Sequence, residues 1–117
     1  MRRAALVVED DAELRGMLQL ALGLEGYDVV TAADGLEALQ RIDRHPPDLV
    51  VLDLGLPKVT GVEIIRELSA HAHTRGISII VVTGSGEDVY HPNVVCVLRK
   101  PIDPKQLVEA VRKCLGG

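Results

Sequence analysis

The chain has 117 residues, of which 47% are apolar, a length that suits one domain with a single buried core, so residues 1–117 are predicted to form one unit. Its formal net charge of -4 disfavours a nucleic-acid surface, because binding to phosphates depends on clustered Lys and Arg. The chain lacks Phe and Trp, so the core is aliphatic and offers no stacking platform for bases. The apolar run near the N-terminus is too short for a signal peptide or a membrane span, which predicts a cytoplasmic protein without membrane contact.

The first predicted unit is a buried strand followed by an amphipathic helix. Residues 4–8 form a short apolar run that ends in three acidic residues, a pattern typical of a strand buried on both faces. Asp11 is the expected N-cap of the helix, and Gly26 is the residue at which that helix is expected to stop. The apolar residues between them recur every three or four positions, which predicts a buried stripe of Leu14, Met17, Leu18, Ala21 and Leu24.

A second strand and a second helix follow. Residues 27–32 carry β-branched side chains and predict a strand. Asp34 with Glu37 matches a capping pattern at a helix start, and Pro46-Pro47 cannot continue that helix. The buried stripe of this helix is predicted to be Leu36, Leu39 and Ile42.

The third predicted strand is fully apolar until its last residue. Residues 49–52 are large and apolar, and Asp53 follows them directly. Gly55 and Pro57 break the extended pattern just beyond that acid. Open α/β sheets bind their ligands outside the carboxyl ends of the strands, so Asp53 is a candidate for chemistry.

The second half of the chain repeats the alternation with one exception. Thr60 and Asp103 each begin a helix with a capping pattern, and residues 78–83 and 94–98 predict two further strands. Residues 84–93 contain two glycines and a proline, so that at most about one or two helical turns fit there. The predicted fold class is therefore α/β, with a five-stranded parallel doubly wound sheet, helices on both faces and a shortened fourth helix.

Parallel pairing would gather polar side chains at one edge of the sheet. They are Glu9, Asp10, Asp53, Thr83 and Lys100. Three neighbouring carboxylates repel one another, so either the pKa of one acid is raised or a cation lies among them, and Mg²⁺ is the hard cation that such oxygen ligands favour. A carboxylate can also attack phosphorus, with a metal and an ammonium neutralising the phosphoryl oxygens. For that chemistry, the Thr83 hydroxyl is the group that could sense the new phosphate by hydrogen bonding to it.

Four motifs occur along the chain in a defined order. They are Val7-Val8-Glu9-Asp10-Asp11, Asp53-Leu54-Gly55-Leu56-Pro57 with Gly61, Val82-Thr83-Gly84 and Lys100-Pro101. Together they resemble the receiver domain of two-component response regulators, and the resemblance covers essentially the whole chain. It implies a flavodoxin-like sheet with strand order 2-1-3-4-5.

The resemblance also implies roles for the acidic residues. The acid at the position of Asp53 accepts a phosphoryl group from a histidine kinase or a histidine phosphotransfer protein. Glu9, Asp10 and the backbone carbonyl of Gly55 would hold Mg²⁺ together with Asp53. The domain would act in signalling and would not be a turnover enzyme.

Further implications concern the basic edge of the site and the partners. Lys100 would contact the phosphoryl group, with a cis peptide bond to Pro101, and Thr83 would move toward it. An output domain or partner protein would receive the signal, without direct contact to nucleic acid. A weak homodimer is compatible with the resemblance.

Several positions depart from the family pattern. Val97 stands where the family commonly has an aromatic residue coupled to the threonine, and the segment from Thr83 to Lys100 is several residues shorter than usual. Gly55 and Ser85 occupy positions that tune dephosphorylation in the family. Two alternatives therefore remain, an interaction module with impaired switching and the receiver domain of a hybrid histidine kinase. A phosphohydrolase would need a second acid two residues after the nucleophile, where this chain has Gly55.

The remaining reactive side chains carry no strong motif. Cys96 and Cys114 form no CxxC pattern and are predicted to be reduced thiols. The histidines are scattered over predicted helix ends and one connection, which predicts that they face solvent: His45, His71, His73 and His91.

Overall fold

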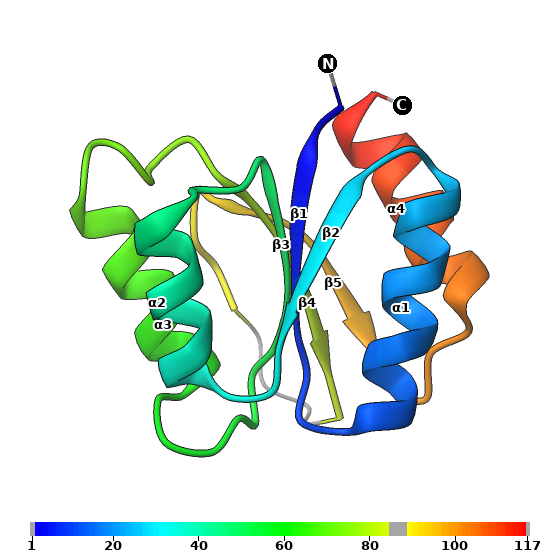
Figure 1. Ribbon diagram of the computed structural model, residues 1–117, viewed down its shortest axis with the longest axis horizontal. Helices are drawn as coiled ribbons and strands as arrows, with labels where there is room; N and C mark the ends of the chain where they lie inside the picture. Colours follow the sequence, from blue (N-terminus) through cyan, green and yellow to red (C-terminus); the bar gives the residue numbers. More distant parts are fainter. Residues whose placement is uncertain (1, 85–88, 117) are drawn as a thin grey trace.

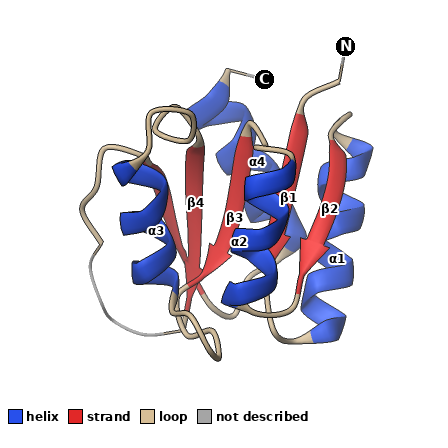
Figure 2. Ribbon diagram, turned by 60° about the vertical axis from the view of Figure 1, so that its left-hand side comes forward, coloured by secondary structure: helices blue, strands red, loops and turns tan. Residues whose placement is uncertain are grey.

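A computed structural model describes residues 2–84 and 89–116 of the chain, which form three layers. In chain order the elements are β1 (Ala4–Val8), α1 (Ala12–Leu24), β2 (Asp28–Ala32), α2 (Gly35–Arg44), β3 (Leu49–Asp53), α3 (Gly61–Ala70), β4 (Ser78–Thr83), β5 (Val94–Arg99) and α4 (Pro104–Leu115). The sheet lies in the middle, with α2 and α3 on one face and α1 and α4 on the other (Figure 1, Figure 2).

All pairings in the sheet are parallel, and the strand order is β2-β1-β3-β4-β5. The predicted α/β class and the predicted strand order are therefore confirmed. The central strand β3 is buried at every residue, because helices cover both of its faces. Val8 pairs with Leu52, and Asp53 pairs with Val82, so the carboxyl ends of β1, β3 and β4 meet at the lower edge in Figure 1.

The core consists of two apolar clusters, one on each face of the sheet. Alternate side chains of a strand point to opposite faces, so Leu52 and Val81 pack toward α2 and α3. Val51 and Val82 pack in the other cluster, together with Leu107 of α4 and with Leu18 and Leu22 of α1. The apolar residues just before the carboxyl ends of β3 and β4 therefore pack in the two clusters, on both faces of the sheet.

The predicted helix caps are confirmed. The Asp11 Oδ1 atom accepts hydrogen bonds from the backbone N–H groups of Glu13 and Leu14 at 3.0 and 3.1 Å. The side chains of Asp34, Thr60 and Asp103 cap α2, α3 and α4 in the same way. Such a cap typically contributes about 1 kcal/mol of helix stability, so each loop that leads from the carboxyl edge into a helix ends at a fixed residue.

Three residues predicted to be buried lie at the surface instead. Met17 is 42% exposed, Leu24 is 78% exposed and Leu36 is 47% exposed. The buried residues of the two helices are Leu18, Ala21 and Leu22 in α1 and Gly35, Ala38 and Ile42 in α2. The apolar residues of both helices span more than one face, and only one face of each helix meets the sheet.

Two strand limits and the fourth connection also differ in detail from the prediction. β2 begins at Asp28, one residue later than predicted, and β5 runs one residue further, to Arg99. Residues 84 and 89–93, the described part of the connection between β4 and β5, contain no helix. Ser85 and the central part of the expected short helix belong to residues 85–88, which lie outside the described residues.

No described helix is long and apolar enough to cross a membrane.

His91 does not face solvent freely, so that prediction was wrong for one histidine. Its Nδ1 atom accepts a hydrogen bond of 3.2 Å from the backbone N–H of Asn93. Its Nε2 atom lies 2.8 Å from the Ser69 hydroxyl, so the ring links the end of α3 to the start of β5. The other three histidines are exposed, as predicted.

Candidate functional site

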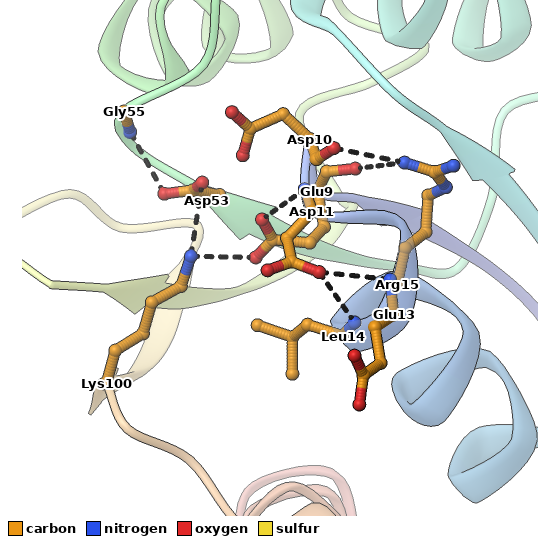
Figure 3. A network of polar contacts seen from close by, with 9 residues as sticks. All are labelled: Glu9, Asp10, Asp11, Glu13, Leu14, Arg15, Asp53, Gly55 and Lys100. Atoms are coloured by element: carbon orange, nitrogen blue, oxygen red, sulfur yellow. Dashed lines mark hydrogen bonds and ion pairs between the residues drawn. The ribbon is translucent and has the colours of Figure 1, made fainter.

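The predicted polar residues lie together at the carboxyl edge of the sheet. Glu9 directly follows β1, Asp53 ends β3, Thr83 ends β4 and Lys100 directly follows β5. The Lys100 ammonium points toward the carboxylates of both Glu9 and Asp53 (Figure 3). Four separate strands therefore each deliver one functional side chain to the same place.

Lys100 is the cation that joins two of the acids. Its Nζ atom lies 2.9 Å from Glu9 Oε1 and 3.3 Å from Asp53 Oδ2. Its backbone N–H donates a hydrogen bond of 2.8 Å to the Thr83 carbonyl, and the peptide bond to Pro101 is cis, as the resemblance implied. Burial lowers the pKa of Lys100, but the two carboxylates outweigh burial and raise that pKa overall. Its ammonium is therefore charged at neutral pH.

The Asp53 carboxylate is held in one orientation. The side chain belongs to a residue that is only 6% exposed, and the backbone N–H of Gly55 donates a hydrogen bond of 3.0 Å to its Oδ1 atom. The Oδ2 atom faces Lys100. One oxygen is thus fixed by the backbone, and the other lies beside a positive charge.

Glu9 is the most deeply buried acid of the site, at 1% exposed. Its Oε2 atom accepts a hydrogen bond of 3.1 Å from the backbone N–H of Asp11. Burial raises the pKa of Glu9, and the nearby acids Asp10 and Asp53 raise it further. The ion pair with Lys100 and the hydrogen bond from the Asp11 backbone N–H lower the pKa, but not enough to cancel this rise. Ionising Glu9 in the metal-free protein is therefore less favourable than ionising it in water.

The three acids fit a hard divalent cation. Carboxylate oxygens of Glu9, Asp10 and Asp53 lie within 4.8 Å of one another. The buried Glu9 Oε1 atom has an ion pair with Lys100 but no aligned hydrogen bond, so it keeps lone pairs for a ligand. Asp10 is exposed and opens the cluster to solvent. Oxygen donors of this kind, with room for retained water, are the coordination that Mg²⁺ prefers.

Arg15 is a part of this site that the motifs do not predict. Its Nη1 atom donates hydrogen bonds to the backbone carbonyls of Glu9 at 2.9 Å and of Asp10 at 3.5 Å (Figure 3). The guanidinium therefore holds the loop that carries two of the three acids. Its only signal in the sequence is its place in the first turns of α1, four residues after the Asp11 cap, and that spacing is not specific.

The comparison with known families identifies the chain. The family model described as the response regulator receiver domain matches residues 5–112. The chain belongs to this family. Receiver domains are the phosphoacceptor domains of two-component signalling, so the predicted functional class is confirmed.

Individual relatives of this receiver domain agree with the family match. The DNA-binding response regulator MtrA of Mycolicibacterium paratuberculosis is 38% identical over 121 residues, which cover 96% of this chain and 51% of that protein. The chain therefore spans about half the length of the curated relatives it matches. The chemotaxis response regulator CheY4 of Vibrio cholerae superposes with a TM-score of 0.87 at 25% identity, over 97% of this chain and 99% of that one. A sensor protein from Polaromonas sp. JS666 gives a TM-score of 0.87 at 30% identity, over 99% of this chain and 98% of that one.

Replacing Arg15 with alanine is expected to weaken Mg²⁺ binding to the receiver domain by about tenfold, the scale found for residues that support metal ligands. Without the guanidinium, the Glu9 and Asp10 carbonyls lose their clamp and the two carboxylates move more freely. Titration calorimetry with MgCl₂ measures the change, and Arg15→Lys should recover part of it. Arg66→Ala, on an exposed part of α3, is the matched control. Wild-type affinity in Arg15→Ala would show that the loop holds its shape without this clamp.

A pH effect follows from the raised pKa of Glu9. In the metal-free protein, the raised pKa means that the protonated Glu9 side chain favours the folded state. This contribution to stability is fully present below the ordinary pKa of Glu9, 4.5, and is lost as pH rises through the higher folded-state pKa. Glu9→Gln removes this loss, so the variant should gain stability relative to wild type across that window. Urea unfolding in EDTA at a series of pH values measures the difference. Glu13→Gln, an exposed change in the first turn of α1, should track wild type; if Glu9→Gln also does so, Glu9 carries no such penalty.

Proposed function

We propose that Asp53 accepts a phosphoryl group from the phosphohistidine of a histidine kinase or a histidine phosphotransfer protein, in a Mg²⁺-dependent reaction. The observation that carries this proposal is that the two oxygens of the Asp53 carboxylate have different partners. The Gly55 N–H donates a hydrogen bond of 3.0 Å to Oδ1, and Lys100 Nζ lies 3.3 Å from Oδ2. An Asp53 oxygen attacks phosphorus as the phosphorus–nitrogen bond breaks, and the bonding electrons leave with the imidazole. Lys100 then lies beside the new phosphoryl oxygens.

The surrounding residues have complementary proposed roles. Glu9, Asp10, Asp53 and the backbone carbonyl of Gly55 would hold Mg²⁺, which when bound neutralises charge on the phosphoryl oxygens. Lys100 stabilises the same developing charge with its ammonium. The buried Thr83 at the end of β4 would bond the phosphoryl group through its hydroxyl.

The proposed setting follows from the family. Residues 1–117 would form a single receiver domain in the cytoplasm, without a membrane or nucleic-acid surface of its own. A histidine kinase or phosphotransfer protein would supply the phosphoryl group, and an output domain or partner protein would receive the signal. The domain assists its own phosphorylation and dephosphorylation but is not proposed to turn over an external substrate.

Phosphorylation by a small donor tests this function. The protein is incubated with acetyl phosphate and Mg²⁺, and its intact mass is measured. We expect a gain of one phosphoryl group that EDTA prevents, and a peptide map that places the group on Asp53. An unshifted mass under these conditions, with the donor shown to be active, would count against the proposal.

A receiver that binds its partner without switching is a second candidate, and Val97 favours it. Val97 is a half-buried residue of β5 that packs against the apolar cluster on the α2 and α3 face, at the position where the family commonly has an aromatic ring. A small aliphatic side chain there has few rotamers to couple to Thr83. Beryllofluoride with Mg²⁺ mimics the phosphorylated state, so amide spectra decide the matter. Unmoved signals from residues 94–98 would favour this second candidate.

A further inference from the structure

Cys96 and Cys114 face the same space between β5 and α4. Cys96 pairs in register with Ile80, whose side chain belongs to the apolar cluster under α4, and Cys96 packs against that cluster. Cys114 lies on α4 three residues after Val111 and seven after Leu107, both buried in the same cluster. Residues at these spacings share one helix face, so Cys114 also faces the sheet.

The chain path brings the two cysteines to the same level. α4 begins just after β5 ends and runs back across the sheet, so its last turn returns toward the first half of β5 (Figure 1). Burial raises the pKa of Cys96, and the neighbouring Cys114 thiol raises it further, in keeping with the shared position of the two side chains between β5 and α4. Both residues are half-buried free cysteines, and β5 is an edge strand, so small reagents can reach the pair.

We propose that Cys96 and Cys114 are a modification site, at which a disulfide oxidant such as oxidised glutathione forms an intramolecular disulfide that ties α4 to β5. One cysteine thiolate attacks a sulfur of the oxidant and releases one glutathione thiolate, leaving a mixed disulfide. The second thiol loses its proton and attacks the protein-bound sulfur, which releases the second glutathione thiolate. The two protein thiols are oxidised to one disulfide, and oxidised glutathione is reduced to two molecules of glutathione.

The surroundings make this pair responsive to oxidant rather than permanently oxidised. A reducing compartment keeps free thiols reduced. The raised pKa of Cys96 makes its thiol a poor attacking nucleophile, so the disulfide forms only where oxidant is abundant. Once formed, the disulfide would close the segment from Cys96 to Cys114, which carries Lys100 and most of α4. A closed segment restricts the unfolded chain and stabilises the folded one.

Equilibration with oxidised glutathione, followed by alkylation and mass spectrometry, tests the proposal on the full chain. Both thiols should become protected together, with a peptide map that links Cys96 to Cys114 and no glutathione attached. The melting temperature should rise on the order of 10 °C and return to its starting value with dithiothreitol. Cys96→Ser and Cys114→Ser should each give a glutathione adduct or a free thiol, without this rise. Cys96→Ala replaces Cys96→Ser if the hydroxyl prevents folding at that half-buried position.

Three results would overturn the proposal. The wild-type protein could carry separate glutathione adducts on Cys96 and Cys114. It could form disulfide-linked dimers on a non-reducing gel. Both wild-type thiols could also remain fully alkylated at a concentration of oxidised glutathione that does modify Cys114 in the Cys96→Ser variant. None of these readouts depends on phosphorylation of Asp53, so the site and the proposed function are tested separately.

Discussion

Replacing Asp53 with asparagine is expected to slow phosphoryl transfer from acetyl phosphate by more than about a thousandfold, the scale seen when an enzyme loses its nucleophile. An amide cannot supply the anionic oxygen that attacks phosphorus. The amide oxygen can still accept the hydrogen bond that Gly55 donates to Asp53 Oδ1, so the loop keeps its shape. The initial rate of the mass gain, measured with and without Mg²⁺, gives the result.

Two controls separate lost chemistry from lost structure. Asp43→Asn removes a carboxylate of the same kind from the exposed face of α2, away from the carboxyl edge, and should phosphorylate at the wild-type rate. Circular dichroism should show that Asp53→Asn is folded. A mass gain in folded Asp53→Asn equal to that of wild type would place the acceptor on another residue.

The reactive edge was predictable because of how buried parallel strands appear in a sequence. Residues 4–8 and 49–52 are apolar runs, and each is followed at once by an acid, Glu9 and Asp53. In a parallel sheet covered on both faces, the first polar residue after such a run can only lie at the carboxyl edge. The location of these side chains therefore needs no knowledge of how the helices pack.

Other features depend on how the helices pack against the sheet, and a local sequence pattern carries no information about that packing. α1 carries apolar residues on more than one face, so its pattern alone could not show that Leu22 is buried and Leu24 is exposed. The reach of Arg15 to two carbonyls depends on the angle between α1 and its preceding loop. The position of Cys114 opposite Cys96 likewise depends on the rotation of α4 against the sheet.

Gly61→Ala is expected to destabilise the protein by about 3 kcal/mol, the upper end of the usual cost of overpacking. A Cβ atom at Gly61 would lie 2.7 Å from Leu54 Cα and 2.8 Å from the Asp53 carbonyl oxygen, which are backbone atoms that cannot rotate away. The Gly61 N–H also donates a hydrogen bond of 3.1 Å to the Leu54 carbonyl, so α3 begins in direct contact with the chain after Asp53. The displaced backbone would carry Asp53 and Gly55 with it, so phosphorylation should slow as well. Urea unfolding and the acetyl phosphate assay measure the two effects.

Gly16→Ala is the matched control, because the same added methyl group meets different surroundings. A Cβ atom at Gly16 has no heavy atom within 4 Å, and Gly16 lies inside α1. Alanine favours a helix interior over glycine by about 1 kcal/mol, so this variant should be more stable than wild type and phosphorylate normally. The same substitution is thus expected to act in opposite directions at the two sites. If Gly61→Ala were as stable as Gly16→Ala, the loop after Asp53 would yield to the methyl group, and a rigid contact with α3 could not be what positions the acceptor.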